Sequence, residues 1–230
     1  PPSRRNIDLN VVLFNNEIYG LTKGQYSPTS KLGKITKTSP YGTVERPFNP
    51  GELVIGAHGT FFARSIDAEV NLTTECMVAA SKHDGLSVIE VLVNCMIFNN
   101  GTHKAFAGDK EVRAEHTITL RQGEKMLFGK NMDKGLMLDN MKLKVVTVGE
   151  NGVTLDDILV HDAHEKDTMV HVMLASMKYP DFPVALGIIR DVAEPTYERE
   201  VARQIAEVQA TAKIKNVDDL LNSGETWEVE

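Results

Sequence analysis

The chain has 230 residues, of which 42% are hydrophobic and 25% are charged. This composition is typical of a globular protein that builds its core without disulfides or structural metals. A net charge of −7 and the lack of a long basic run argue against nucleic acid as a partner. No apolar stretch approaches the ~18 residues that a membrane-spanning helix needs, so we expect no membrane contact. Two cysteines cannot form a disulfide framework, which favours a reducing, cytoplasmic location.

The first hundred residues alternate between strand and helix patterns. Apolar, β-branched runs predict buried strands, and the sequence Asn49-Pro50-Gly51-Glu52 predicts a helix start with Asn49 as N-cap and Glu52 as its reciprocal partner. In chain order we expect a strand at 9–13, an extended connection at 26–47, a helix at 49–56, a strand at 60–65, a helix at 68–82 and a strand at 86–93. This alternation predicts an α/β fold, with a parallel sheet that carries helices on both faces.

From residue 99 onward the pattern changes to shorter, more broken elements. We expect a polar loop at 99–116, a small β meander within 121–160, a helix at 168–177, a strand at 184–192, an amphipathic helix at 198–212 and a docked tail at 220–230. The second part of the chain is therefore predicted to be a smaller α+β extension of the sheet domain.

The segment 14–30, FNNEIYGLTKGQYSPTS, directly follows the first predicted strand. Ligands of open α/β sheets bind beyond the carboxyl ends of the strands, which is where this segment would lie. Asparagine and main-chain carbonyl oxygens suit Mg²⁺, which usually keeps substrate phosphates among its ligands. Gly20 and Gly24 would let the backbone approach a phosphate or a flat ring. From the residues alone, the segment is either a magnesium–phosphate loop or an ordinary polar connection.

The same segment closely resembles the thiamine diphosphate loop in the β subunit of 2-oxoacid:ferredoxin oxidoreductases, in particular the 2-oxoglutarate type (2-oxoglutarate synthase). Further segments follow in that family's order: RRNIDLNVVLFNN, NPGELVIGAHGTFFAR, NCMIFNNG, HDAH, GIIRDVAEPTYE and LLNSGETWEV. The resemblance implies that the Asn16 side chain and the Ile18 main-chain carbonyl bind Mg²⁺, whereas Asn15 only shapes the turn. It assigns the lining of the diphosphate and the ring to four residues, Tyr19, Gly20, Leu21 and Thr22.

The resemblance also implies a reaction and a domain division. The family converts 2-oxoglutarate, CoA and oxidised ferredoxin to succinyl-CoA, CO₂ and reduced ferredoxin, and part of the active site comes from an α subunit. Residues 1–98 would be the C-terminal part of the thiamine-diphosphate-binding domain, 99–196 the C-terminal region typical of the β subunits, and 197–230 an amphipathic helix with its tail. The family's Gly-Asp-Gly motif, whose aspartate binds Mg²⁺, is absent. We therefore expect an N-terminally truncated fragment that alone is inactive and binds the cofactor weakly or not at all.

The two cysteines receive different interpretations. A lone cysteine beside apolar residues is usually a small buried hydrophobe, and Cys76 is interpreted in that way. Cys95, in NCMIFNN after the strand predicted at 86–93, has the same ordinary interpretation. The resemblance instead makes Cys95 the fourth ligand of a 4Fe-4S cluster that passes electrons to ferredoxin. Four thiolates usually hold such a cluster, so we expect Cys95 to be a free thiol in this chain alone.

Weaker hypotheses come from other polar residues. His161, Asp162 and His164 (HDAH) could form a zinc triad, but they lack the H-E-x-x-H spacing. Lys23 could meet a phosphate or a substrate carboxylate, or be a solvated loop lysine. The leading hypothesis is therefore the β subunit of an oxidoreductase that acts on 2-oxoglutarate. The alternatives are pyruvate or another 2-oxoacid as substrate, a metal-dependent hydrolase built on HDAH, and a non-catalytic module that binds another subunit.

Overall fold

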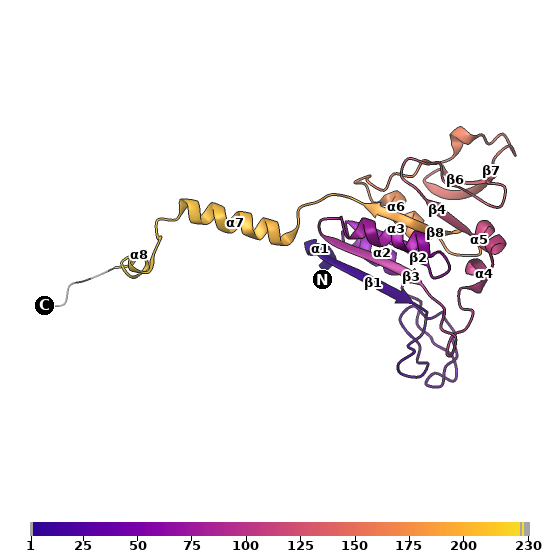
Figure 1. Cartoon of the computed structure of the whole chain (residues 1–230), viewed down its shortest axis with the longest axis horizontal. Helices are drawn as coiled ribbons and strands as arrows, with labels where there is room; N and C mark the ends of the chain where they lie inside the picture. The colour runs from indigo at the N-terminus through magenta and orange to yellow at the C-terminus, as the bar shows by residue number, and fades with distance from the viewer. Residues whose placement is uncertain (1, 226, 228–230) are drawn as a thin grey trace.

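In the computed structural model, which describes residues 2–225 and 227, a five-stranded sheet carries helices on both faces (Figure 1). This sheet has the order β1-β3-β2-β8-β4 and consists of β1 (Leu9–Asn15), β2 (Phe61–Ile66), β3 (Leu86–Leu92), β4 (Thr117–Leu120) and β8 (Val184–Asp191). A second sheet contains three antiparallel strands, β5 (Leu127–Phe128), β6 (Lys134–Asp139) and β7 (Lys142–Thr147). The second sheet confirms the meander predicted within 121–160.

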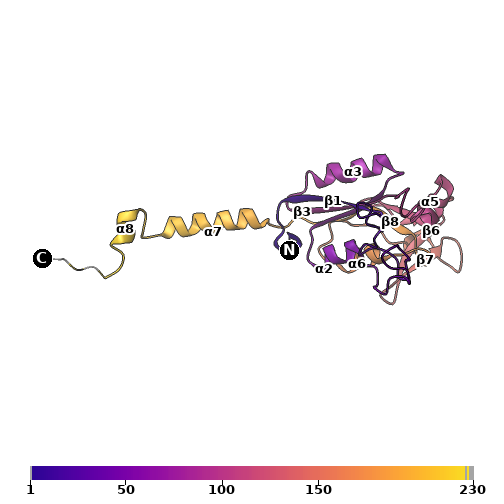
Figure 2. The ribbon, with the colours of Figure 1, turned by 90° about the horizontal axis from the view of Figure 1, so that it is seen from below.

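Helices cover the larger sheet on two sides. The body contains α1 (Pro2–Arg5), α2 (Pro50–Gly56), α3 (Val70–Ala80), α4 (Lys104–Ala107), α5 (Lys110–His116), the 3-10 helix η1 (Leu155–Asp157) and α6 (Met169–Ser176). Figure 2 shows α3 on one face of the sheet and α2 with α6 on the other. The helices predicted at 49–56, 68–82 and 168–177 are thus confirmed. Among the described residues, no helix is both long and apolar enough to cross a bilayer.

The start of α2 follows the predicted capping pattern, with one difference. Asn49 Oδ1 accepts the main-chain N–H of Gly51 at 3.0 Å and that of Glu52 at 3.3 Å. Glu52 was expected to accept the main-chain N–H of Asn49. Its carboxylate instead accepts the Asn49 side-chain amide at 2.9 Å, because Asn, unlike Ser or Thr, offers an N–H₂ group of its own at this position.

The predicted parallel sheet is found in one half of the larger sheet. β1 and β2 both run parallel to β3, as expected for strands that are connected through helices. β8 pairs antiparallel with β2, and β4 runs parallel to β8, so the complete sheet is mixed. Since β4 and β8 come from the segment 99–196, that segment completes the sheet that residues 1–98 begin. The division at residue 98 remains a prediction.

β1 is a strand as predicted, but the prediction that it is buried is wrong. It lies at the edge of the sheet, where β3 is its one partner among the described strands. Val11, Val12 and Leu13 are each 37% exposed. All seven residues of β3, by contrast, are buried between β1 and β2. An apolar run indicates that the side chains of a strand favour burial. It does not show whether another part of the protein packs against them.

Alternating side chains of β2 fill the core on both sides of the sheet. Phe61 and Ala63 pack with Leu72 and Cys76 of α3, whereas Phe62 packs with the layer formed by α2 and α6. This alternation is the two-residue period of a strand. Cys76 is therefore a core residue, as the sequence indicated, and burial raises the pKa of its thiol to about 11.

The segment 99–116 was predicted to be a polar loop, and this prediction is wrong because the segment contains α4 and α5. Asp109 caps α5, since its Oδ1 accepts the main-chain N–H of Glu111 at 3.0 Å and that of Val112 at 2.9 Å. Neither helix has a buried residue. With four and seven residues, the two helices are too short to show the apolar periodicity from which a helix is recognised.

The C-terminal helix α7 (Tyr197–Thr211) extends away from the body as an arm, and α8 (Val217–Leu221) follows it (Figures 1 and 2). α7 confirms the helix predicted at 198–212. Its apolar residues Ile205 and Val208 are 50% and 61% exposed. In the tail, Leu220 and Leu221 are exposed rather than docked on the described body, and residues 226 and 228–230 lie outside the described residues.

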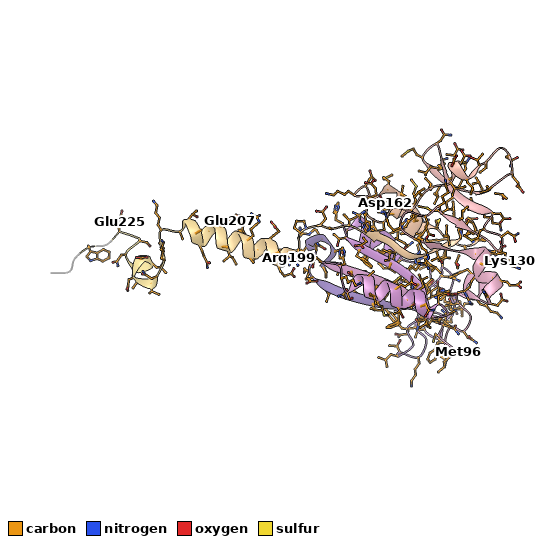
Figure 3. The ribbon with its side chains drawn as sticks, turned by 45° about the horizontal axis from the view of Figure 1, so that its top comes forward. Met96, Lys130, Asp162, Arg199, Glu207 and Glu225 are labelled. Atoms are coloured by element: carbon orange, nitrogen blue, oxygen red, sulfur yellow. The ribbon has the colours of Figure 1, made fainter. Side chains whose placement is uncertain are left out.

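The base of this arm is tied to the N-terminal segment. Asn6 donates its side-chain amide to the main-chain carbonyls of Glu194 and Pro195 at 3.1 and 3.2 Å. Arg199 forms an ion pair with Asp84 at 2.8 Å. Figure 3 shows Arg199 at this junction and Met96 at the opposite end of the body. The arm therefore leaves from the amino end of β1, away from the loops at its carboxyl end.

Candidate functional site

The loop that follows β1 lies at the carboxyl end of the parallel strands, as predicted (Figure 1). Asn16 Oδ1 accepts the main-chain N–H of Ile18 at 3.1 Å, which forms an Asx turn. A carbonyl oxygen has two lone pairs, so this bond leaves Asn16 Oδ1 one acceptor position. Among the described residues, no hydrogen bond reaches the Ile18 carbonyl oxygen. The two oxygens predicted to bind Mg²⁺ thus belong to one turn and keep free acceptor capacity.

Glu17, between these two residues, has an unusual backbone conformation. Its φ is +52°, which lies in the left-handed region that residues other than glycine seldom adopt. Several hydrogen bonds hold it there: its N–H donates to Asn15 Oδ1 at 3.2 Å, and its carbonyl accepts from Ser30 Oγ at 2.6 Å. Its carboxylate accepts from Thr102 Oγ1 at 2.5 Å. The turn is therefore fixed by groups from three parts of the chain.

The predicted lining residues Tyr19, Gly20, Leu21 and Thr22 form the tip of this loop. Tyr19 closes it, because its N–H donates to Gln25 O at 2.8 Å and its carbonyl accepts from Gly24 N at 3.0 Å. Leu21 is 99% exposed, and a Cβ at Gly20 would meet no heavy atom within 4 Å. Gly24 has φ +96°, and a Cβ there would lie 2.9 Å from the Phe98 ring. In this structure, the missing side chain of Gly24 therefore lets the Phe98 ring approach the loop backbone closely.

A buried ion pair lies beneath the loop and was not anticipated. Arg64 Nε donates to Glu90 Oε2 at 2.7 Å across β2 and β3, and both side chains are less than 8% exposed. The other Glu90 oxygen accepts from Asn15 Nδ2 at 2.7 Å. Asn15 Oδ1 in turn accepts from Thr29 Oγ1 at 2.7 Å. Asn15 shapes the turn, as predicted, and Glu90 connects it to the centre of the sheet.

These groups line a cavity of about 240 Å³ at the same edge of the sheet. Its lining includes the aromatic side chains of Phe48, Phe106 and Tyr179. His103, Arg64 and Glu90 contribute the buried polar groups. Concave sites of this kind, largely apolar with a few convergent polar groups, are where small ligands usually bind.

Cys95 lies in the segment that follows β3 and is partly exposed. Its carbonyl accepts the main-chain N–H of Asn99 at 3.0 Å, which folds 94–103 back toward the 15–18 turn. Cys76 is in the core, and no group of three or more potential ligands that could hold a metal occurs in the described part of the chain. One thiolate does not fit a four-thiolate cluster held by this chain alone. The cluster role of Cys95 remains a prediction.

The HDAH side chains are directed to separate structural partners. Buried His161 donates from Nε2 to Ile188 O at 2.8 Å, and His164 Nδ1 donates to Asp191 O at 2.6 Å. The Asp162 carboxylate accepts the Gln122 side-chain amide at 2.8 Å. The two histidines join this loop to β8 and Asp162 joins it to Gln122, so the geometry lends no support to the zinc hypothesis.

Buried histidines should make the stability of the protein depend on pH. His171 donates from Nε2 to Asp162 O at 2.8 Å and accepts from Arg190 Nη1 at 2.9 Å through Nδ1, so its ring must be neutral. Burial lowers the pKa of both His171 and His161. The unfolded chain would take up these protons below about pH 6.5, while the folded protein would not. The free energy of unfolding should therefore fall with acid below that pH, by up to ~1.4 kcal/mol per unit for each histidine.

Urea unfolding between pH 7.5 and 5.5 tests this prediction. A His171→Gln variant keeps a donor and an acceptor in place but cannot titrate, so its loss of stability with acid should be clearly smaller than that of the wild type. The exposed His58, changed to Gln, is the matched control and should keep the wild-type pH dependence. Equal pH dependence in the wild type and His171→Gln would contradict the account.

Comparison with known proteins agrees with this geometry. The sequence profile of the family "Thiamine pyrophosphate enzyme, C-terminal TPP binding domain" matches residues 3–91, which contain β1, its loop, β2 and all but the last residue of β3. The chain is 38% identical, over 99% of its length, to the 2-oxoglutarate oxidoreductase subunit KorB of Mycobacterium tuberculosis, and it spans 61% of that subunit. A 2-oxoglutarate synthase subunit KorB of Archaeoglobus fulgidus is 46% identical over 40% of the chain and 34% of that subunit.

A solved structure shows the same fold. It is a 2-oxoglutarate:ferredoxin oxidoreductase from Magnetococcus marinus with 2-oxoglutarate, coenzyme A and succinyl-CoA bound, and it aligns with a TM-score of 0.67 at 21% identity. The alignment covers 98% of this chain and 61% of that one.

The fold and the loop at the end of β1 thus define an α/β domain of the thiamine pyrophosphate enzyme type. Within that class, the chain is similar along 99% of its length to the 2-oxoglutarate oxidoreductase subunit KorB, and along 42% of its length to a β subunit of a 2-oxoacid:ferredoxin oxidoreductase from Saccharolobus solfataricus.

Sequence reasoning missed three groups of this site: the Arg64–Glu90 pair, Glu17 and the polar residues of 99–103. For the ion pair a signal exists, since each of two strands predicted to be buried, FFARSI and LSVIEVL, carries one charged residue of opposite sign. Buried charges are almost always paired, so these two could have been matched. The contacts of Glu17 with Asn99 and Thr102 join residues more than 80 positions apart and leave no local pattern.

Proposed function

We propose that this chain is the part of a 2-oxoglutarate:ferredoxin oxidoreductase β subunit that holds Mg²⁺ and thiamine diphosphate through the loop after β1. The observation that carries the proposal is the 16–18 turn, in which Asn16 Oδ1 and the Ile18 carbonyl, both hard oxygen donors, keep acceptor capacity at the carboxyl end of the parallel strands. Bound thiamine diphosphate supplies the electron sink for the pair that decarboxylation leaves behind.

The residues of the chain then have distinct tasks. Asn16 and Ile18 would hold the metal, and the 19–22 tip would cover the diphosphate and the ring. Lys23, which follows this tip, would meet an anionic group of the substrate or cofactor. The buried Glu90 would keep the base of the loop rigid through Asn15. Preorganised donors of this kind cost no reorganisation when the ligand binds.

The names of the relatives support a substrate and partners. The M. tuberculosis and A. fulgidus proteins are named for 2-oxoglutarate, which supports that substrate over pyruvate. The solved M. marinus enzyme is named for ferredoxin and holds coenzyme A, which supports CoA as acyl acceptor and ferredoxin as electron acceptor. Cys95 would be one of four thiolate ligands of a 4Fe-4S cluster, the others coming from outside this chain. An α subunit would complete the active site, and the exposed apolar residues of the α7 arm are suited to contact with another subunit. Alone, the chain should not turn over 2-oxoglutarate.

Turnover by the assembled oxidoreductase tests the proposal. The enzyme that contains this chain, purified with its α subunit, is assayed with 2-oxoglutarate, pyruvate and a branched 2-oxoacid, each with CoA and a viologen dye. We expect dye reduction that requires CoA and added thiamine diphosphate, with the highest kcat/KM for 2-oxoglutarate. A clear preference for pyruvate would overturn the substrate assignment. Turnover that does not need thiamine diphosphate would overturn the proposed function itself.

A further inference from the structure

The strained residue of the site lies between the two proposed metal ligands. Left-handed φ values are uncommon for residues other than glycine, and such conformations cost about 1–3 kcal/mol unless the surroundings impose them. Glu17 adopts one at φ +52°. Its backbone sets the direction of the peptides that join Asn16 to Ile18. Whatever holds Glu17 therefore also sets how the Asn16 side chain and the Ile18 carbonyl are arranged relative to each other.

Three side chains of the segment 99–103 contact this turn at three consecutive residues. Asn99 Nδ2 donates to Asn16 O at 2.9 Å and to Glu17 O at 3.4 Å. Thr102 Oγ1 donates to the Glu17 carboxylate at 2.5 Å. His103 Nε2 donates to Asn15 O at 3.0 Å. These bonds span more than 80 residues of sequence, and Asn99 and His103 are 7% and 6% exposed.

The chemistry of these contacts is directional. The Asn15 carbonyl can only accept, so His103 carries its proton on Nε2. Its Nδ1 has no hydrogen-bond partner within the described part of the chain and lies 4.0 Å from Glu17 Oε1. Lys34 Nζ donates to Asn99 Oδ1 at 2.5 Å, which orients the Asn99 amide so that Nδ2 faces the turn. Each contact thus presents a donor to an oxygen of the turn, and the Asn99 amide is itself oriented by Lys34.

We propose that Asn99, Thr102 and His103 are positioning residues for the metal site. They hold Glu17 in its left-handed conformation and so preset Asn16 Oδ1 and the Ile18 carbonyl for Mg²⁺. This inference rests on the proposed function of the loop. It adds that the affinity for Mg²⁺ is determined in part by the segment 99–103, which supplies neither of the two proposed metal ligands and follows Cys95 in the chain.

Mg²⁺ titration of the assembled oxidoreductase at saturating thiamine diphosphate, followed by calorimetry, tests the inference. Asn99→Asp keeps the shape of the side chain but replaces the amide donor with an oxygen. We expect its Mg²⁺ affinity to fall about 10- to 100-fold, which is typical when a group that orients a metal ligand is lost. The neighbouring Asn100 is exposed, and its Oδ1 accepts from Asn94, so Asn100→Asp keeps its contact and is the matched control. Asn100→Asp should bind Mg²⁺ like the wild type.

A second pair of variants covers the case in which Asn99→Asp does not fold. Thr102→Val removes the hydroxyl at nearly constant volume and should weaken Mg²⁺ binding about 10-fold, whereas Thr102→Ser keeps the hydroxyl and should restore it. A residue with a structural role alone would lower the thermal unfolding midpoint and leave the Mg²⁺ affinity of the folded protein unchanged. Unchanged Mg²⁺ affinity in folded Asn99→Asp or Thr102→Val would overturn the inference.

The wild-type titration separates this inference from the proposed function. If the wild type binds thiamine diphosphate with Mg²⁺ and the Asn99 and Thr102 variants bind equally well, the positioning role is wrong and the function stands. If the wild type shows no Mg²⁺-dependent binding, the proposed function fails, and the positioning role fails with it.

Discussion

Replacing Asn16 by alanine in the assembled oxidoreductase should weaken the binding of Mg²⁺–thiamine diphosphate by about 100-fold or more. The substitution removes a proposed metal ligand and also the 3.1 Å bond from Ile18 N that shapes the turn. Loss of a group that merely orients a ligand typically costs about 10- to 100-fold, so loss of a ligand should cost at least the upper end of that range. Calorimetric titration with the cofactor at fixed Mg²⁺ measures the effect.

Two further variants make this result specific. Asn16→Asp keeps an oxygen for the metal and an acceptor for Ile18 N, so it should retain much more affinity than Asn16→Ala. Asn71, exposed on α3, is the matched control, and Asn71→Ala should bind the cofactor like the wild type. Wild-type affinity in a folded Asn16→Ala protein would show that the metal is held elsewhere.

Removing the Glu90 carboxylate should have the largest effect on stability of any single substitution considered. Glu90→Ala leaves the Arg64 guanidinium buried and unpaired, because both side chains are less than 8% exposed. Breaking a buried ion pair in this way typically costs about 3–5 kcal/mol. The substitution also deprives Asn15 of the partner that ties the loop to the sheet. Urea unfolding should show a lower midpoint, and cofactor affinity should fall as well.

The comparison with an exposed pair shows whether burial is the cause. Arg121 and Glu75 form an ion pair at 3.3 Å with side chains that are 51% and 55% exposed. Glu75→Ala should therefore change the free energy of unfolding by less than about 1 kcal/mol. The double variant Arg64→Met/Glu90→Leu should recover much of the loss, since an apolar pair removes the uncompensated charge. A Glu90→Ala protein as stable as Glu75→Ala would refute the assigned role.

The secondary structure was predicted well wherever the residues form a buried or half-buried face. β2 and β3 are apolar because both of their faces are buried. The start of α2 was predicted from its N-cap Asn49 and its first residue Pro50. The helices α4 and α5 were missed because they are only four and seven residues long and show too little periodic pattern. The exposure of β1 was missed because burial depends on which elements lie next to the strand in space. An apolar run shows only that its side chains favour burial.

The candidate site was predictable in its local part. The Asn-Asn pair and the glycines at the end of a strand are contiguous in sequence, and their resemblance to a known loop identified Asn16 and Ile18 as candidate ligands. The support of that loop comes from distant positions: Asn15 meets Glu90, and Glu17 meets Thr102. Such pairings are set by the order of strands in the sheet and by the path of the 94–103 segment. A single sequence does not contain this information in any local pattern.

The position of the metal tests the central claim most directly. Mn²⁺ can take the place of Mg²⁺, and anomalous diffraction from crystals of the assembled oxidoreductase with thiamine diphosphate would locate it. The account predicts one peak within coordination distance, about 2.2 Å, of both Asn16 Oδ1 and the Ile18 carbonyl oxygen. A well-ordered loop after β1, with the Mn²⁺ peak bound to neither oxygen, would contradict it.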